Sequence, residues 1–85
     1  MCFLGVFPKG RSVCSNVDDE VNTGFWTVNS HTSGTQAPMA EGQVLMVVGN
    51  GDYVAQIAIG CESNKMYHRS KLNRPDVEWS SWALA

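Results

Sequence analysis

The residues that could do chemistry are few in this chain and lie far apart. Three cysteines, Cys2, Cys14 and Cys61, and two histidines, His31 and His68, are the possible metal ligands or nucleophile–base partners. Structural zinc sites present paired ligands at close spacing, as in Cys-x-x-Cys, and no such pair occurs in this sequence. No signature of a cysteine nucleophile surrounds Cys14 or Cys61. We therefore expect no metal, no cofactor, and cysteines that serve as small apolar residues.

Asp52 and Glu62 are the acidic residues that could form a catalytic pair, because each lies near an expected turn. Glycosidase chemistry needs two acids on opposite sides of the scissile bond, so a small hydrolase or lyase acting on bacterial glycans would depend on this pair. Asp52, however, follows Asn50-Gly51 and is better explained by turn chemistry. Residues 49–51 also lack the helix and lysine that follow a phosphate-binding loop. We predict that the protein is not an enzyme.

Size and charge exclude further classes of protein. The 85 residues fit a single domain, 1–85, and the formal net charge is −2. The six lysines and arginines are scattered, whereas a nucleic-acid-binding protein usually shows a basic stripe. No stretch is long enough to span a membrane. We therefore expect no nucleic-acid partner and no membrane insertion.

Short apolar runs separated by turn residues predict a mainly β fold: a small single-domain antiparallel sheet of about five strands. The runs that read as strands are 3–7, 24–28, 43–48, 53–59, 65–71 and 78–84. The uninterrupted apolar run 43–48 is typical of a central strand buried on both faces. Asn50-Gly51 predicts a hairpin, since both residue types tolerate positive φ. Residues 15–22 are expected to form a short helical turn near the N-terminus.

The roles of Arg69 and of the last two tryptophans follow from the strand period. Trp79 and Trp82 lie three apart in an expected strand, so their side chains should point to opposite faces, one of them toward a neighbouring subunit, solvent or a second layer. Arg69 either contacts a ligand or interface, or is structural and pairs with Asp76 or Glu78 or stacks on a tryptophan. We favour the structural role.

A series of short motifs runs through the chain in a fixed order after the acidic pair Asp18-Asp19. The motif residues are Gly24, Phe25, Trp26, Pro38, Gln56, Tyr67, Arg69, Trp79 and Trp82. This order resembles the knob domains of phage tail fibres and R-type pyocin fibres, the pyocin knob family, over about residues 3–84.

The resemblance implies a knob-like module of a virion tail fibre, made in the bacterial cytoplasm and working outside the cell. Such a module would be a homotrimer that binds, or supports binding to, a bacterial surface glycan or receptor. Polar loop residues are the expected receptor contacts, because loops carry specificity. These are His31, Thr32, Ser33, Thr35, Gln36, Asn50 and Asn64. Two points stay open: whether the domain is excised from a longer fibre, and whether it is instead a stand-alone small β-barrel that binds a peptide or single-stranded nucleic acid.

Overall fold

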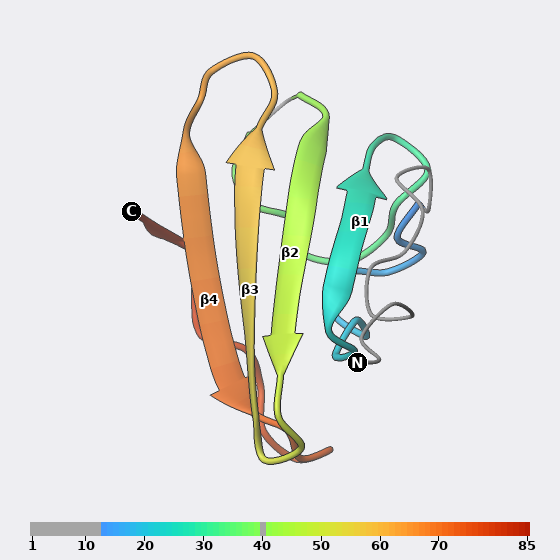
Figure 1. Cartoon of the computed structure of the whole chain (residues 1–85), viewed down its shortest axis with the longest axis vertical. Coiled ribbons are helices and arrows are strands. Elements are labelled where there is room, and N and C mark those ends of the chain that lie inside the picture. Colours follow the sequence, from blue (N-terminus) through green and yellow to red (C-terminus); the bar gives the residue numbers. More distant parts are fainter. Residues whose placement is uncertain (1–12, 40) are drawn as a thin grey trace, which may run out of the picture.

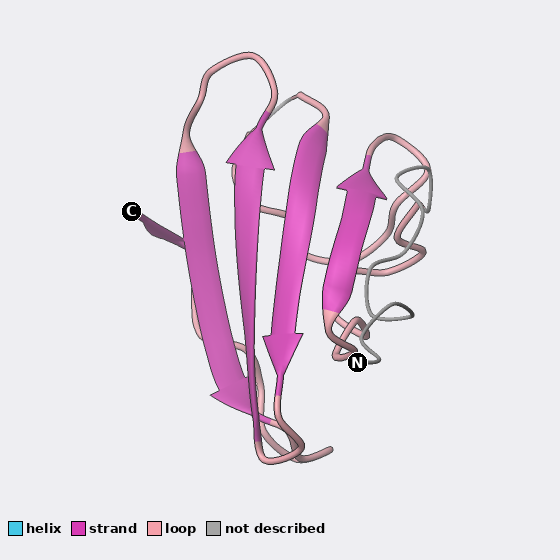
Figure 2. Cartoon of the chain, in the orientation of Figure 1, coloured by secondary structure: helices cyan, strands magenta, loops and turns pink. Residues whose placement is uncertain are grey.

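The computed structural model describes residues 13–39 and 41–85, which form one open antiparallel sheet (Figures 1 and 2). The strands pair in chain order: β1 (Gly24–Val28), β2 (Gln43–Gly49), β3 (Tyr53–Gly60), β4 (Met66–Leu72) and β5 (Ala83–Leu84). The prediction of a mainly β domain with about five antiparallel strands is confirmed. β1 and β5 form the two edges of this sheet, so the described residues do not close into the barrel of the alternative hypothesis.

One of the expected elements is much shorter in the structure, one is confirmed as a single turn, and one lies outside the described residues. Only Ala83–Leu84 of the expected strand 78–84 pairs with β4, so that prediction is wrong for most of its length. In the segment 15–22 the amides of Asp19 and Glu20 donate to carbonyls three residues earlier, which makes a turn. No helix occurs within 13–39 or 41–85. The expected strand 3–7 falls among the residues that are not described.

The segment 15–22 does not continue into a helix because its backbone is bonded elsewhere. The amide of Val17 donates to the carbonyl of Ser33, and the amide of Ser33 donates to the carbonyl of Ser15. The amide of Asp18 donates to the side-chain oxygen of Asn16. Side chains such as Asn commonly compete in this way with helical hydrogen bonds. The turn is thereby fixed against the loop that follows β1.

The hydrophobic core lies on one face of the sheet. Its strand residues include Val28, Leu45, Val47, Val54 and Ala58, all of them buried. Three irregular segments cover this face: the chain before β1, the loop between β1 and β2, and the chain after β4. In Figure 1 these segments run behind the sheet. They add further buried residues, namely Cys14, Val17 and Ala37.

β2 is buried on one face rather than on both. Leu45 and Val47 point into the core, whereas Val44 is 44% exposed and Val48 is 52% exposed. The prediction of a strand buried on both faces is therefore wrong for the single chain. The physical reason is that no described segment covers the second face, although its residues are apolar.

The outer edges of β1 and β4 are partly covered by the chain itself. The amide of Cys14 donates to the carbonyl of Thr27, which places the segment before β1 along the outer edge of β1. On the other side, β5 pairs with Tyr67 and His68 of β4, and the amide of Ser80 donates to the carbonyl of Ser70 farther along β4. Unpaired edge strands invite pairing with other chains, and these contacts reduce that exposure.

The predicted hairpin between β2 and β3 is confirmed, with one refinement. Gly51 has a φ of 96°, whereas Asn50 is not among the residues with positive φ. The side-chain oxygen of Asn50 instead accepts hydrogen bonds from the amides of Asp52 and Tyr53. Asn50 therefore contributes its side chain to this turn, and Gly51 contributes the left-handed backbone.

Gly34 sits where a side chain would be both strained and obstructed. Its φ is 96°, and a Cβ atom there would lie 3.0 Å from Cγ2 of Val17 and 3.1 Å from the amide nitrogen of Asp18. We expect Gly34→Ala to lower the free energy of unfolding by about 2–4 kcal/mol, from left-handed strain together with overpacking. Urea unfolding followed by tryptophan fluorescence measures this change.

Two other glycines separate the two causes. A Cβ on Gly51, with φ 96°, would meet nothing within 4 Å, so Gly51→Ala should cost only the backbone strain of about 1–2 kcal/mol. Gly42 has neither a positive φ nor a neighbour within 4 Å of such a Cβ, and Gly42→Ala should change little. If Gly34→Ala cost no more than Gly51→Ala, the close approach of the loop to residues 16–18 would be contradicted.

Candidate functional site

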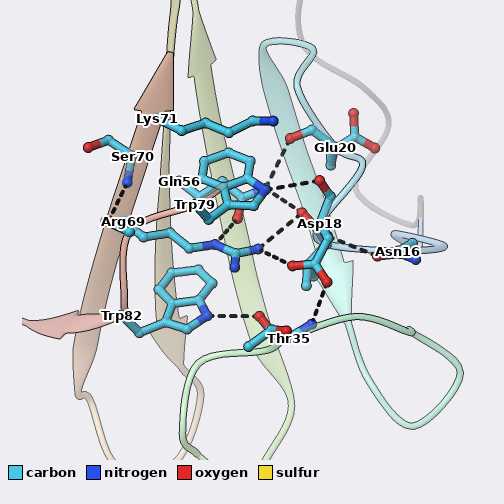
Figure 3. Close-up of polar contacts among 12 residues, drawn as sticks. Asn16, Asp18, Glu20, Thr35, Gln56, Arg69, Ser70, Lys71, Trp79 and Trp82 are labelled. Carbon is cyan, nitrogen blue, oxygen red and sulfur yellow. Dashed lines mark hydrogen bonds and ion pairs between the residues drawn. The ribbon is translucent and has the colours of Figure 1, made fainter. Parts of the chain in front are cut away.

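The most elaborate polar site of the molecule is built around Arg69 of β4 (Figure 3). The residue is 3% exposed and points from β4 into the covered face of the sheet. Its Nε donates to the side-chain oxygen of Gln56 at 2.8 Å. Its Nη2 donates to the carbonyl of Val17 at 3.2 Å and lies 3.1 Å from Oδ1 of Asp18. A buried guanidinium is thus held by an amide, a carbonyl and a carboxylate.

Trp79 and Trp82 enclose the same guanidinium. The Arg69 Cζ atom lies 4.5 Å from the ring centroid of Trp79 and 4.4 Å from that of Trp82. Figure 3 shows Arg69 between the two rings. The prediction that the two tryptophans point to opposite faces is therefore wrong. Residues 79–82 do not form a strand, and both rings face the guanidinium of Arg69.

The two indole groups also tie the C-terminal segment to the N-terminal part of the domain. The Nε1 of Trp79 donates to the carbonyl of Asp18 at 2.9 Å, and the Nε1 of Trp82 donates to the carbonyl of Thr35 at 2.8 Å. Each tryptophan therefore contributes a ring face and a hydrogen bond.

Gln56 of β3 is fully buried, and both the nitrogen and the oxygen of its side-chain amide form hydrogen bonds. Its Nε2 donates to the carbonyls of Val17 at 2.7 Å and Glu20 at 3.0 Å, while its Oε1 accepts from Arg69. Because a glutamine has two donor hydrogens on one side and an acceptor on the other, these partners fix the orientation of the amide. We call Asp18, Gln56, Arg69, Trp79 and Trp82 the Arg69 cluster.

Electrostatics favour a charged Arg69 despite its burial. Burial lowers the pKa of Arg69, and the hydrogen bond and charge of Asp18 oppose that shift. The guanidinium stays protonated, since the usual pKa of arginine is far above neutral. The side chain of Asp18 is 38% exposed, so water still reaches the carboxylate. These contacts agree with the structural role of Arg69, although its acidic partner is Asp18 and not Asp76 or Glu78 as predicted.

A shallow cavity of about 550 Å³ lies against the outer side of the Arg69 cluster. All residues of the cluster except the buried Gln56 line it, together with Thr35, Lys71, Val77, Glu78 and the two serines of the segment 79–82. Hydroxyl groups, a lysine and a carboxylate beside tryptophan rings suit a polar ligand that presents both hydrogen-bonding groups and an apolar face.

The predicted receptor contacts on the loop between β1 and β2 divide into two groups. His31, Ser33 and Thr35 are exposed. Thr32 is only 8% exposed: its hydroxyl accepts from the amide of Asn29, and its carbonyl accepts from Nε2 of Gln36. Thr32 and Gln36 therefore stabilise the loop from within and leave the other three residues at its surface.

The remaining predicted contacts, Asn50 and Asn64, lie at opposite ends of the sheet. Asn64, with φ 59°, belongs to the turn between β3 and β4. A carboxylate oxygen of Glu41 joins this turn to the end of the β1–β2 loop by accepting from the amides of Glu62 and Ser63, at 2.6 and 2.9 Å. These hydrogen bonds lower the pKa of Glu41. Asn50 lies in the β2–β3 turn, so the structure brings Asn64 to the loop and leaves Asn50 apart.

The residues of the tail-fibre motif also separate in space. Gln56, Arg69, Trp79 and Trp82 meet in the Arg69 cluster. Gly24 is buried, and Trp26 and Tyr67 are partly buried against the core. Phe25 is 37% exposed on the other face, and Pro38 is exposed in the loop. The Nε1 of Trp26 is buried and has no hydrogen-bond partner among the described residues.

The geometry gives no support to the acid-pair chemistry. Asp52 precedes β3 and Glu62 follows it, and the eight residues of this strand span about 26 Å. The two carboxylates therefore lie at opposite ends of the sheet and cannot form the pair that this chemistry needs. Burial raises the pKa of the Cys14 thiol, and the nearby charge of Glu20 raises it further, so Cys14 fits its role as a core residue. No three potential metal ligands gather within the described ranges.

Comparison with known proteins finds no family model, no curated protein and no solved structure that matches the chain. The tail-fibre resemblance therefore depends on the order of the motif residues alone. The described part of the chain also contains no helix of the length and hydrophobicity that a membrane span requires.

Proposed function

We propose that the chain is a non-enzymatic structural and receptor-recognition module of a phage or phage-derived tail fibre, trimeric and outside the cell in its working form. The observation that carries this proposal is the convergence of Gln56, Arg69, Trp79 and Trp82 on one cluster. Short motifs that matched by accident would have no reason to touch one another. Four of the nine motif residues instead share one structural centre, as residues of a common family motif would.

The recognition surface that we propose joins the exposed loop residues to the cavity beside the Arg69 cluster. Thr35 belongs to both, because it lines the cavity and is one of the exposed loop residues. The Arg69 cluster supplies a rigid platform, while the loop carries side chains that can vary without loss of the fold. The ligand class is a bacterial surface glycan, whose hydroxyls and ring faces match polar groups beside tryptophan.

Binding of the labelled chain to a panel of bacterial cells and purified surface polysaccharides tests the proposal. The informative variant carries His31→Ala, Ser33→Ala and Thr35→Ala, because the known contacts of Thr35 use only its backbone. We expect the dissociation constant of the triple variant to rise at least about tenfold, the loss of roughly 1.4 kcal/mol. Arg74→Ala, in an exposed turn after β4, is the control and should bind like the wild type.

Two results would count against the proposal. Unchanged binding by the triple variant would remove the loop from the recognition surface. Failure to bind any cell or polysaccharide, together with salt-dependent binding to oligonucleotides, would contradict the tail-fibre function and favour the nucleic-acid-binding alternative.

A further inference from the structure

One face of the sheet is apolar, and no segment within residues 13–39 or 41–85 covers it. Because side chains alternate along a strand, the face opposite the core consists of every second residue of β2, β3 and β4. We call it the open face. Its residues are Val44, Met46, Val48, Tyr53, Ala55, Ile57, Ile59, Met66, His68, Ser70 and Leu72.

The open face is exposed over much of its extent. Tyr53 is 60% exposed, Val48 52% and Val44 44%. In Figure 1 the irregular segments that are described run behind the sheet, and none of them crosses in front of β2, β3 and β4. The only ionisable groups among the residues of this face are His68 and the phenol of Tyr53. Because the face carries no acidic residue and no lysine, burying it does not remove a carboxylate or an ammonium group from water.

The open face is also not flat. A cavity of about 540 Å³ opens on it beside the turn between β2 and β3, and its lining includes Val48, Ala55, Ser70 and Leu72. Tyr53 belongs to the same lining and is the most exposed of the large apolar residues on the open face. A protruding phenol ring therefore stands next to a hollow with mainly apolar walls, as hot-spot residues do at protein interfaces.

We infer that the open face is the interface between copies of this chain. Two identical faces without formal charge meet without like-charge repulsion, whereas a strongly charged partner would find nothing to pair with. Association through strand edges is disfavoured, since the outer edges of β1 and β4 are partly covered by the chain itself. The inference stands on this face alone and does not depend on the tail-fibre function.

The area of the open face is close to what such an interface needs. Strands β2, β3 and β4 contain seven, eight and seven residues, which at about 3.3 Å by 4.8 Å each project to about 350 Å². Two such faces project to about 700 Å², and their accessible area is larger because side chains protrude. The accessible area therefore approaches the roughly 1,000 Å² that a specific interface needs. Sheets pack face to face at about 10 Å, which leaves room for Tyr53 to enter the hollow of the neighbouring copy.

Light scattering on a sizing column, with the full 85-residue chain over a range of concentrations, tests the inference. We expect a discrete dimer or trimer at about 10 µM and a monomer for Val48→Glu, through at least an approximately 100-fold rise in the dissociation constant. Leu84→Glu is the matched control. Leu84 is 61% exposed and lies opposite Tyr67, on the side of the sheet away from the open face. This variant should keep the wild-type mass.

The fold of each variant is checked by circular dichroism and tryptophan fluorescence. If Val48→Glu does not fold, Val44→Glu at the other end of β2 replaces it, with the same expected dissociation. A wild-type chain that is monomeric up to about 100 µM would overturn the inference. A folded Val48→Glu or Val44→Glu variant that keeps the wild-type mass would overturn it equally.

Discussion

Replacement of Arg69 by alanine is expected to lower the free energy of unfolding by about 3–5 kcal/mol, which is a large part of the 5–15 kcal/mol typical of a domain. The side chain is 2% exposed and lies between Trp79 and Trp82. Its removal leaves a void between the two rings. It also leaves the buried Oε1 of Gln56 without its donor, which costs about 1–3 kcal/mol by itself.

The cost comes mainly from the buried side of the Arg69 cluster. Asp18 would lose its ion pair, but its side chain is 38% exposed and can be hydrated again. Gln56 and the carbonyl of Val17 have no such access to solvent on their buried side, since both residues are at most 1% exposed. For this reason we expect Asp18→Asn to destabilise the fold much less than Arg69→Ala.

Lys71→Ala is the matched control for charge and aromatic contact. Lys71 also belongs to β4, and its Nζ lies 5.3 Å from the ring centroid of Trp79. Its remaining contact is a long hydrogen bond of 3.4 Å to the carbonyl of Val77. A partly exposed pair of this kind contributes less than about 1 kcal/mol.

The loss of stability for Arg69→Lys should fall between those of Arg69→Ala and Lys71→Ala, at about 2–3 kcal/mol. Lysine keeps the charge but lacks the Nε donor and the planar group that stacks on the rings.

Urea unfolding, followed by the fluorescence of the tryptophans, measures all three variants. Arg69→Lys keeps the comparison possible if Arg69→Ala does not fold. Equal losses of stability from Arg69→Ala and Lys71→Ala would show that the buried hydrogen bonds of Arg69 contribute little, and would contradict the structural role of the cluster.

The strands could be predicted from the sequence because their signals are local. Short apolar runs bounded by turn residues identified β1 to β4. The Asn50-Gly51 pair located the hairpin, since a turn is determined by the residues within it.

The contacts of the site could not be predicted, because they join distant segments. The carbonyl of Val17 is 52 residues away from Arg69, and no local period indicates that the two should meet. For Trp79 and Trp82 the local rule was wrong, because stacking on one cation and two indole hydrogen bonds replaced the strand conformation. Thr32 and Gln36 were placed at a receptor by their polarity, which gives no indication that they bond to the loop itself.

The apolar run of β2 has a different explanation. A continuous run indicates burial on both faces, and the single chain buries only one of them. If copies of the chain meet through the open face, the apolar residues on the second face of β2 are buried in the assembly rather than in the monomer. The sequence pattern and the uncovered face are then two consequences of one interface.

Replacement of Gln56 by leucine is expected to lower the free energy of unfolding by about 3–4 kcal/mol. Leucine has nearly the same volume, but it leaves the carbonyls of Val17 and Glu20 without the Nε2 donor and Arg69 without its acceptor. Each buried group that loses its partner costs about 1–3 kcal/mol. Urea unfolding at pH 7 measures the loss, which should not change between pH 7 and pH 4 relative to the wild type.

Gln56→Glu separates the two sides of the amide. A carboxylate can still accept from Arg69, but its second oxygen would face the two carbonyls and could donate only when protonated. The folded state should therefore raise the pKa of this glutamate above its unfolded value of about 4.3. A raised carboxyl pKa destabilises the fold as pH rises between the unfolded and the folded pKa, so the gap to the wild type should be smallest near pH 4 and largest above the folded pKa. If the leucine and glutamate variants showed the same loss at every pH, the donation of Nε2 to the two carbonyls could not be what holds the turn at residues 17–20 to β3.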